Sequence, residues 1–110
     1  MLFRSVVVGG GVVEMDEKVS SFVAAVSEAA VNAARHSGVT NISVYVEVED
    51  DKLTAFVRDQ GKGFDINAID SDRRGIADSI TGRMKRSGGK ATIRSNVGEG
   101  TEVELEVPRA

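Results

Sequence analysis

The sequence predicts an α+β fold, a two-layer sandwich in which helices cover one face of a mixed, mostly antiparallel sheet. Several segments alternate apolar and polar residues, as strands with one buried face do, and two segments repeat apolar residues at helical spacing. Their order is strand, helix, two strands, loop, helix, two strands, and turn residues join the paired strands as hairpins. Because only two helices are expected, they can cover only one side of the sheet.

The first half of the chain supplies the first strand and the longer helix. Residues 3–8 are rich in valine and are followed by three glycines at 9–11, which predicts a strand that runs into a turn. Asp16 is suited to cap a helix that continues without glycine to Ser37-Gly38, a helix-stop signal. At about 100° per residue, its apolar residues form one stripe and its polar residues a separate one. The polar stripe comprises Glu28, Asn32, Arg35 and His36.

The second half supplies two hairpins and the shorter helix. Residues 41–49 and 53–59 alternate around Asp50-Asp51-Lys52, which predicts a hairpin with one buried face. A polar loop is expected over residues 61–74 and a helix over residues 75–87, closed by Gly88-Gly89. The last hairpin is expected to pair residues 90–95 with 101–107 around the turn at 96–100. We find no internal repeat or linker, so the 110 residues are interpreted as one domain, 1–110.

Composition excludes several classes of partner and site. The absence of cysteine rules out disulfides and thiolate metal sites and favours the cytosol. The longest purely apolar run is Val6-Val7-Val8, far shorter than a membrane span, so we expect a soluble chain without membrane contact. The net charge of −3 argues against nucleic acid or an anionic membrane as a partner, since both require a basic face.

Glu28 and Asn32 are the first candidates for chemistry. They lie four residues apart on the predicted helix, so both side chains project from the same face. The amide oxygen of asparagine is a hard ligand suited to Mg²⁺, and a carboxylate beside it could accept a proton. The alternative is an ordinary solvated helix face, and the pair alone does not decide between them.

The segment Asp59-Gln60-Gly61-Lys62-Gly63 is the second candidate. An aspartate at the end of a buried strand, followed by Gly61 and Gly63, lets the backbone approach a flat ligand while the carboxylate accepts a hydrogen bond from an exocyclic amine. Adenine carries such an amine. Aspartate and glycine are also ordinary turn residues, so a simple turn remains the alternative.

Arg73, Arg74 and Gly75 are the phosphate candidates. We expect them to open the second helix, where free backbone N–H groups and arginines would suit an anion. The other basic residues of this helix, Arg83, Lys85 and Arg86, are interpreted as a solvated face. No phosphate-loop fingerprint occurs in the chain, and Gly9-Gly10-Gly11 is interpreted as structural.

In order and spacing, four segments resemble the ATP-binding domain shared by sensor histidine kinases and their relatives among the gyrase, Hsp90 and mismatch-repair ATPases. They are residues 27–37, 57–64, 88–90 and 95–101. The resemblance covers nearly the whole chain and implies the Bergerat-type ATP-binding sandwich. It also implies ATP and Mg²⁺ as cofactors.

Carried over to this sequence, the resemblance assigns a role to each matching residue. Asn32 would bind Mg²⁺, and Glu28 would assist phosphoryl transfer. Asp59 would accept the adenine amine with Gly61 and Gly63 beside the base, and Thr101 would hold adenine through water. Arg35 would lie near the phosphates, and residues 65–74 would form a lid over them.

The lid's end departs from the Gly-x-Gly of many relatives, because here the run is Gly75-Ile76-Ala77. Residues 74–84 instead resemble actinobacterial membrane sensor kinases, which implies nucleotide contacts by Arg74, Gly75 and Ile76.

Sensor kinases phosphorylate a histidine on a separate dimerisation domain, and we expect that domain to be absent from this chain. His36 is not a phosphoacceptor candidate, since it lies within the nucleotide helix. The resemblance thus implies a cytoplasmic catalytic domain of a membrane-bound kinase, inactive alone and monomeric as a fragment. Its partners would be the phosphoacceptor domain and, through it, a response regulator. The alternatives are an anti-sigma-factor-type serine kinase and a nucleotide-binding module without transfer activity.

Overall fold

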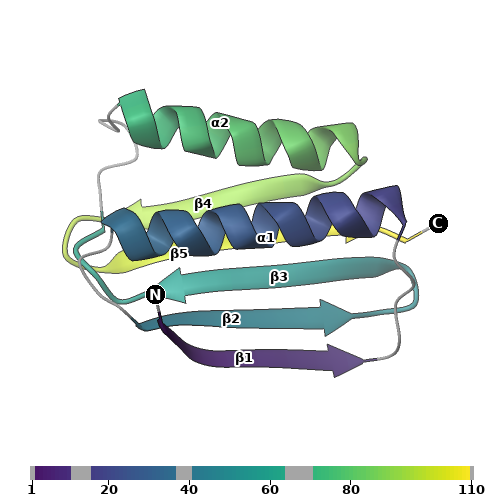
Figure 1. Ribbon diagram of the computed structural model, residues 1–110, viewed down its shortest axis with the longest axis horizontal. Coiled ribbons are helices and arrows are strands. Elements are labelled where there is room, and N and C mark those ends of the chain that lie inside the picture. Colours follow the sequence, from purple (N-terminus) through teal and green to yellow (C-terminus); the bar gives the residue numbers. More distant parts are fainter. Residues whose placement is uncertain (1, 11–15, 37–40, 64–70, 110) are drawn as a thin grey trace.

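The computed structural model describes residues 2–10, 16–36, 41–63 and 71–109. Within them the chain forms five strands and two helices in two layers, with both helices on one face of the sheet (Figure 1). The elements are β1 (Leu2–Gly10), α1 (Glu17–His36), β2 (Asn41–Val48), β3 (Lys52–Asp59), α2 (Ser71–Arg86), β4 (Lys90–Asn96) and β5 (Gly100–Pro108). The predicted α+β sandwich is confirmed.

The strand order in the sheet is β1-β2-β3-β5-β4. β1 pairs with β2 in parallel, and every other neighbouring pair is antiparallel. The two predicted hairpins are the pairs β2–β3 and β4–β5. The last strand, β5, lies between β3 and β4, so both hairpins join in one sheet. This strand order places the end of β3 beside the start of β5.

The first strand is longer than expected. Gly9 and Gly10 were assigned to a turn, but they extend β1 and pair with Glu47 and Val48 of β2. Pairing with a neighbouring strand outweighs the weak intrinsic preference of glycine for strands.

Helix α1 begins where the sequence predicts, because the Oδ1 atom of Asp16 accepts a hydrogen bond from the backbone N–H of Val19 at 2.8 Å. This contact satisfies one of the free N–H groups at the helix start. Helix α2 ends as predicted, where the N–H groups of Gly88 and Gly89 donate to the carbonyls of Lys85 and Met84.

The predicted start of α2 was wrong by four residues. The helix begins at Ser71 rather than at Gly75, which is its fifth residue. Serine and aspartate are favoured at helix starts, and Ser71-Asp72 supplies both, whereas Gly75 was mistaken for the boundary. Residues 71–74 of the expected lid are therefore helical, and residues 64–70 lie outside the described residues.

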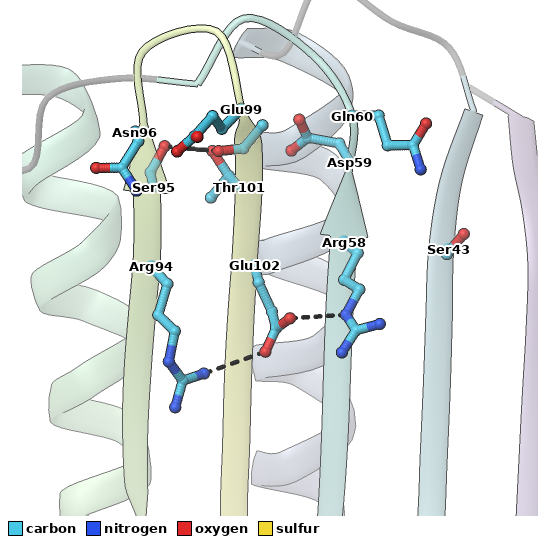
Figure 2. Close-up of a pocket in the computed structure, with 11 residues that line it drawn as sticks. Ser43, Arg58, Asp59, Gln60, Arg94, Ser95, Asn96, Glu99, Thr101 and Glu102 are labelled. Atoms are coloured by element: carbon cyan, nitrogen blue, oxygen red, sulfur yellow. Dashed lines mark hydrogen bonds and ion pairs between the residues drawn. The ribbon is translucent and has the colours of Figure 1, made fainter.

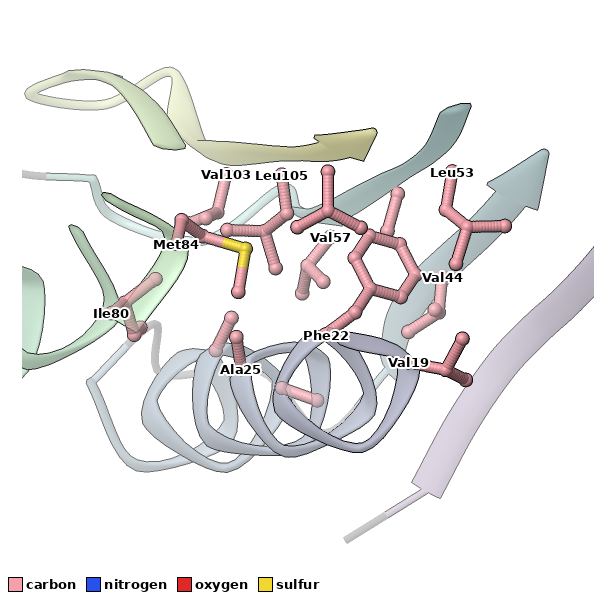
Figure 3. Close-up of a cluster of buried hydrophobic side chains, with 14 of the residues drawn as sticks. Val19, Phe22, Ala25, Val44, Leu53, Val57, Ile80, Met84, Val103 and Leu105 are labelled. Atoms are coloured by element: carbon pink, nitrogen blue, oxygen red, sulfur yellow. The ribbon is translucent and has the colours of Figure 1, made fainter. Parts of the chain in front are cut away.

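The core lies between the sheet and the two helices. Phe22 and Ala25 of α1 and Ile80 and Met84 of α2 point toward the sheet (Figure 3). The predicted apolar stripe of α1 is confirmed, since its members are buried or pack against the buried cluster. They are Val19, Phe22, Val26, Ala29, Ala30 and Ala33.

The outer face of the sheet carries rows of opposite charge, and neither of the two described helices covers it (Figure 1). Arg94 lies 3.1 Å from both Glu102 and Glu104, and Lys52 lies 3.1 Å from Glu106. Such pairs keep this face solvated but contribute little each to stability, because water screens them. In the described part of the chain, neither helix has the length and apolar character needed to cross a bilayer.

Candidate functional site

A row of polar side chains lies at one end of the sheet, where β3 and β4 end and β5 begins. Asp59 of β3 pairs with Thr101 of β5, and Thr101 pairs in turn with Ser95 of β4. Because side chains alternate along a strand, all three belong to the face that the helices cover. The next row inward, Val57, Val103 and Ile93, is part of the core or packs against it. The polar row thus forms the boundary of the core at this end.

Asp59 is held in a fixed orientation at the end of β3. The residue is only 7% exposed, and its Oδ1 atom accepts a hydrogen bond from the N–H of Gly61 at 2.9 Å. This contact turns the chain immediately after the strand, as aspartate does in Asx turns. An ionised carboxylate can only accept hydrogen bonds, so Asp59 places an acceptor at the end of β3.

The glycine segment after Asp59 lies against the β4–β5 turn. The N–H of Gly98 donates to the carbonyl of Lys62 at 2.7 Å. Gly63 has a φ of +60°, and a Cβ at this position would overlap the carbonyl oxygen of Asn96. Glycine is required here because the two backbones touch and because φ is positive. The structure therefore gives Gly63 a packing role that the sequence did not predict.

An open hollow of about 800 Å³ lies at this end of the sheet. Asp59, Thr101 and Ser95 line it together with Gln60, which follows β3, and Asn96, the last residue of β4 (Figure 2). The hollow continues onto the outer face of the sheet. There Arg58 and Arg94 flank Glu102 at 2.7 and 3.1 Å.

Glu28, Asn32 and Arg35 lie in the C-terminal half of α1, which ends at the same end of the molecule as β3 (Figure 1). Glu28 and Asn32 are half-buried and Arg35 is exposed, and none of the three lines the hollow. The Oδ1 atom of Asn32 is buried without a hydrogen-bond partner among the described residues. A buried amide oxygen in this state fits a hard cation, so Asn32 is suited to Mg²⁺.

The start of α2 also lies at this end of the molecule (Figure 1). Arg74 and Gly75 are exposed, and no atom lies within 4 Å of a Cβ built on Gly75. Ile76 is half-buried and packs against the core. The structure thus gives Ile76 a packing role, whereas Arg74 remains open to solvent. Arg73 and His36 belong to the helices, but their side chains are not among those that the structure describes.

Comparison with known proteins identifies the family. The model of the histidine kinase-, DNA gyrase B-, and HSP90-like ATPases matches residues 17–110. The chain belongs to this family. Sensor histidine kinase LiaS of Bacillus subtilis (strain 168) is 34% identical over 83 residues, which are 76% of this chain and 23% of LiaS. The signal transduction histidine-protein kinase/phosphatase DegS of the same organism is 33% identical over 84 residues, or 74% of this chain and 22% of DegS.

A solved structure shares the fold. The Erythrobacter litoralis EL346 blue-light activated histidine kinase superposes with a TM-score of 0.73 at 21% identity, over 94% of this chain and 34% of that one. The resemblance to the catalytic ATP-binding domain of histidine kinases is therefore confirmed. The chain spans less than a quarter of the length of LiaS and DegS.

Sequence reasoning missed the part played by Ser95. Its Oγ atom donates to the carbonyl of Gly100 at 3.0 Å and lies 2.8 Å from Oγ1 of Thr101. The signal was present, because Ser95 and Thr101 lie at equal distances from the centre of the predicted turn and so face each other across the hairpin. It was overlooked because serine is common beside turns.

Proposed function

We propose that the chain binds Mg²⁺-ATP and is the catalytic domain of a larger sensor histidine kinase. The observation that carries the proposal is the polar row at the end of β3 and the start of β5, within a chain of this ATPase family. Asp59 is buried, and a hydrogen bond from Gly61 orients its carboxylate. This carboxylate is a hydrogen-bond acceptor, which suits the exocyclic amine of adenine. Thr101 lies beside it in the next strand, and Gly61 and Gly63 would flank the base.

Asn32 is the proposed ligand of Mg²⁺. The described residues contain no cluster of three or more histidine, aspartate or glutamate side chains that could hold a metal. A site with few protein ligands suits Mg²⁺, which keeps water and phosphate oxygens around it. Bound there, Mg²⁺ would supply charge neutralisation at the phosphates. Arg35 and Arg74 are exposed near the end of the molecule where β3 ends, and they would add positive charge beside the phosphates. Contacts of Gly75 and Ile76 with the nucleotide stay predictions.

The proposed reaction is transfer of the γ-phosphoryl group to a histidine on a phosphoacceptor domain. An imidazole nitrogen bonds to the γ-phosphorus while the bond to the bridging oxygen breaks, so that ADP leaves and phosphohistidine forms. Glu28 is suited to take the proton that the imidazole loses, because it lies one helical turn before Asn32. The response regulator would then receive the group from that histidine. We place this domain on the cytoplasmic side of a membrane-bound kinase.

Calorimetry with a non-hydrolysable ATP analogue tests the binding step. We expect Mg²⁺ to strengthen binding to the wild type, and we expect Asn32→Ala to bind the analogue equally with and without Mg²⁺. A wild-type protein that binds no analogue would refute the proposal. If Asn32→Ala kept the full Mg²⁺ effect, the assignment of the metal ligand would be wrong.

The transfer step is tested by adding the phosphoacceptor domain of a related kinase and following labelled phosphate. Glu28→Gln should lower the rate of incorporation by about 100-fold or more, the usual contribution of a positioned proton acceptor. Glu17→Gln, at the exposed start of the same helix, is the matched control and should not change it. Equal rates for the two variants would remove Glu28 from the reaction.

A further inference from the structure

The outward side of α1 lacks the charged residues that usually cover an exposed helix face. Between Val19 and Ala34 the only charged residue is Glu28. Helix α2 lies beside α1 on the same face of the sheet, not over it (Figure 1). Val23 is 48% and Val31 44% exposed, which makes them two of the four large apolar residues that are exposed in the described part of the chain. Helix α1 therefore presents an uncharged, partly apolar surface to solvent.

The two exposed valines belong to one ridge along the helix. Val23, Ser27 and Val31 follow one another at four-residue spacing, and all three are exposed. The valines are about 12 Å apart along the helix axis. Among the described residues, neither valine is a member of the core cluster. We call these three residues the α1 ridge, and packing within the described chain does not account for its apolar character.

The α1 ridge borders the residues proposed for phosphoryl transfer. Glu28 lies three residues before Val31, so the two side chains are neighbours on the helix surface. The adjacent row along the helix consists of Ala24, Glu28 and Asn32, all half-buried. The surface between two such rows is the kind of groove into which a second helix packs its own ridge. A helix seated in this groove would lie directly beside Glu28.

We propose that the α1 ridge docks an apolar helix of the phosphoacceptor domain and thereby brings the histidine of that domain to Glu28. The inference rests on the proposed function and names the surface that holds its protein substrate. Glu28 can take the imidazole proton only at hydrogen-bond distance, so the phosphoacceptor domain must cover the helix surface around Glu28. An apolar face on the docked helix would remove Val23 and Val31 from water, which favours association.

The kinetics of phosphoryl transfer to the phosphoacceptor domain of a related sensor kinase test this docking surface. Val23→Asp places a charge in the α1 ridge, five residues before Glu28. We expect this change to raise the KM for the phosphoacceptor domain by about tenfold or more, the effect of one valine that can no longer be buried. The kcat should stay close to the wild-type value, because Glu28 and the nucleotide site are unchanged. Val97→Asp, at the 74% exposed valine between β4 and β5, is the matched control and should leave KM unchanged.

The possible outcomes separate docking from other roles of the α1 ridge. A wild-type KM for Val23→Asp, or an equal rise for Val97→Asp, would overturn the inference. A fall in kcat with an unchanged KM would also overturn it, since it would place the effect in the chemical step. Circular dichroism should show both variants folded, and both should bind the ATP analogue as the wild type does.

Sedimentation velocity of the chain alone tests a second copy as the occupant of the α1 ridge. We expect Val23→Asp and the wild type to have the same oligomeric state. A wild-type dimer that Val23→Asp dissociates would assign the ridge to contact between copies and overturn the inference. Wild-type protein that binds no ATP, or transfers no phosphate, would refute the proposed function instead, so the two failures are distinguishable.

Discussion

Gly63→Ala should strongly destabilise the protein, because a methyl group at this position has no space. The φ of Gly63 is +60°, and its Cβ would overlap the carbonyl oxygen of Asn96 and lie 2.9 Å from that of Gly100. The left-handed backbone costs about 1–2 kcal/mol for a residue with a side chain. Overpacking against a rigid neighbour adds about 1–3 kcal/mol. We therefore expect a loss of about 2–5 kcal/mol in the free energy of unfolding.

Two other glycines serve as matched controls that separate these causes. Gly98 has a φ of +82° but no atom within 4 Å of a built Cβ, so Gly98→Ala should cost only the backbone part, about 1–2 kcal/mol. Gly75 is helical, exposed and equally open, so Gly75→Ala should stabilise the protein by about 0.5–1 kcal/mol. The predicted order of stability is Gly75→Ala, wild type, Gly98→Ala, Gly63→Ala.

Urea unfolding followed by far-ultraviolet circular dichroism measures all four proteins, since the chain has no tryptophan for fluorescence. The midpoints of thermal unfolding should follow the same order. A Gly63→Ala variant no less stable than Gly98→Ala would refute the close contact between the glycine segment and the β4–β5 turn.

Further predictions concern a helix start, the core and the charged sheet face. Asp16→Ala removes the acceptor for the N–H of Val19 and should cost about 0.5–2 kcal/mol in urea unfolding; no loss would contradict the cap. Leu105→Ala empties a fully buried site and should cost about 2–5 kcal/mol, and a loss typical of surface sites would contradict its burial. The hydrogen bond from Lys52 holds the pKa of Glu106 below its ordinary value. Because the folded-state pKa is the lower one, this stabilisation is complete above the ordinary pKa of glutamate and is lost as pH falls through the lowered pKa. The stability difference between wild type and Glu106→Gln should therefore vanish in acid, and a difference that is constant with pH would contradict the ion pair.

Much of the fold follows from local patterns in the sequence. Strands β2 and β3 were predicted to within one residue at each boundary, because alternation directly marks a strand with one buried face. Helix α1 was predicted from its cap at Asp16 and its apolar stripe. These signals arise from residues close in sequence, so a single chain reveals them.

Contacts between distant segments were harder to predict. The start of α2 was missed because glycine usually disfavours a helix interior, yet packing by Ile76, Ile80 and Met84 holds Gly75 within one. The Ser95–Thr101 pair depends on strand register, and the packing of Gly63 on Asn96 depends on two turns that meet only in the folded chain. By contrast, Asp59 was correctly expected at the end of a buried strand, where it is buried and oriented.

The central claim is that Asp59 recognises the base of ATP, and a titration of ATP into Asp59→Ala tests it most directly. Asp50→Ala removes an exposed carboxylate from the turn at the other end of β3 and is the matched control. Circular dichroism should show both variants folded. We predict that Asp50→Ala binds ATP as the wild type does and that Asp59→Ala shows no detectable binding. Wild-type affinity of Asp59→Ala for ATP would contradict the claim.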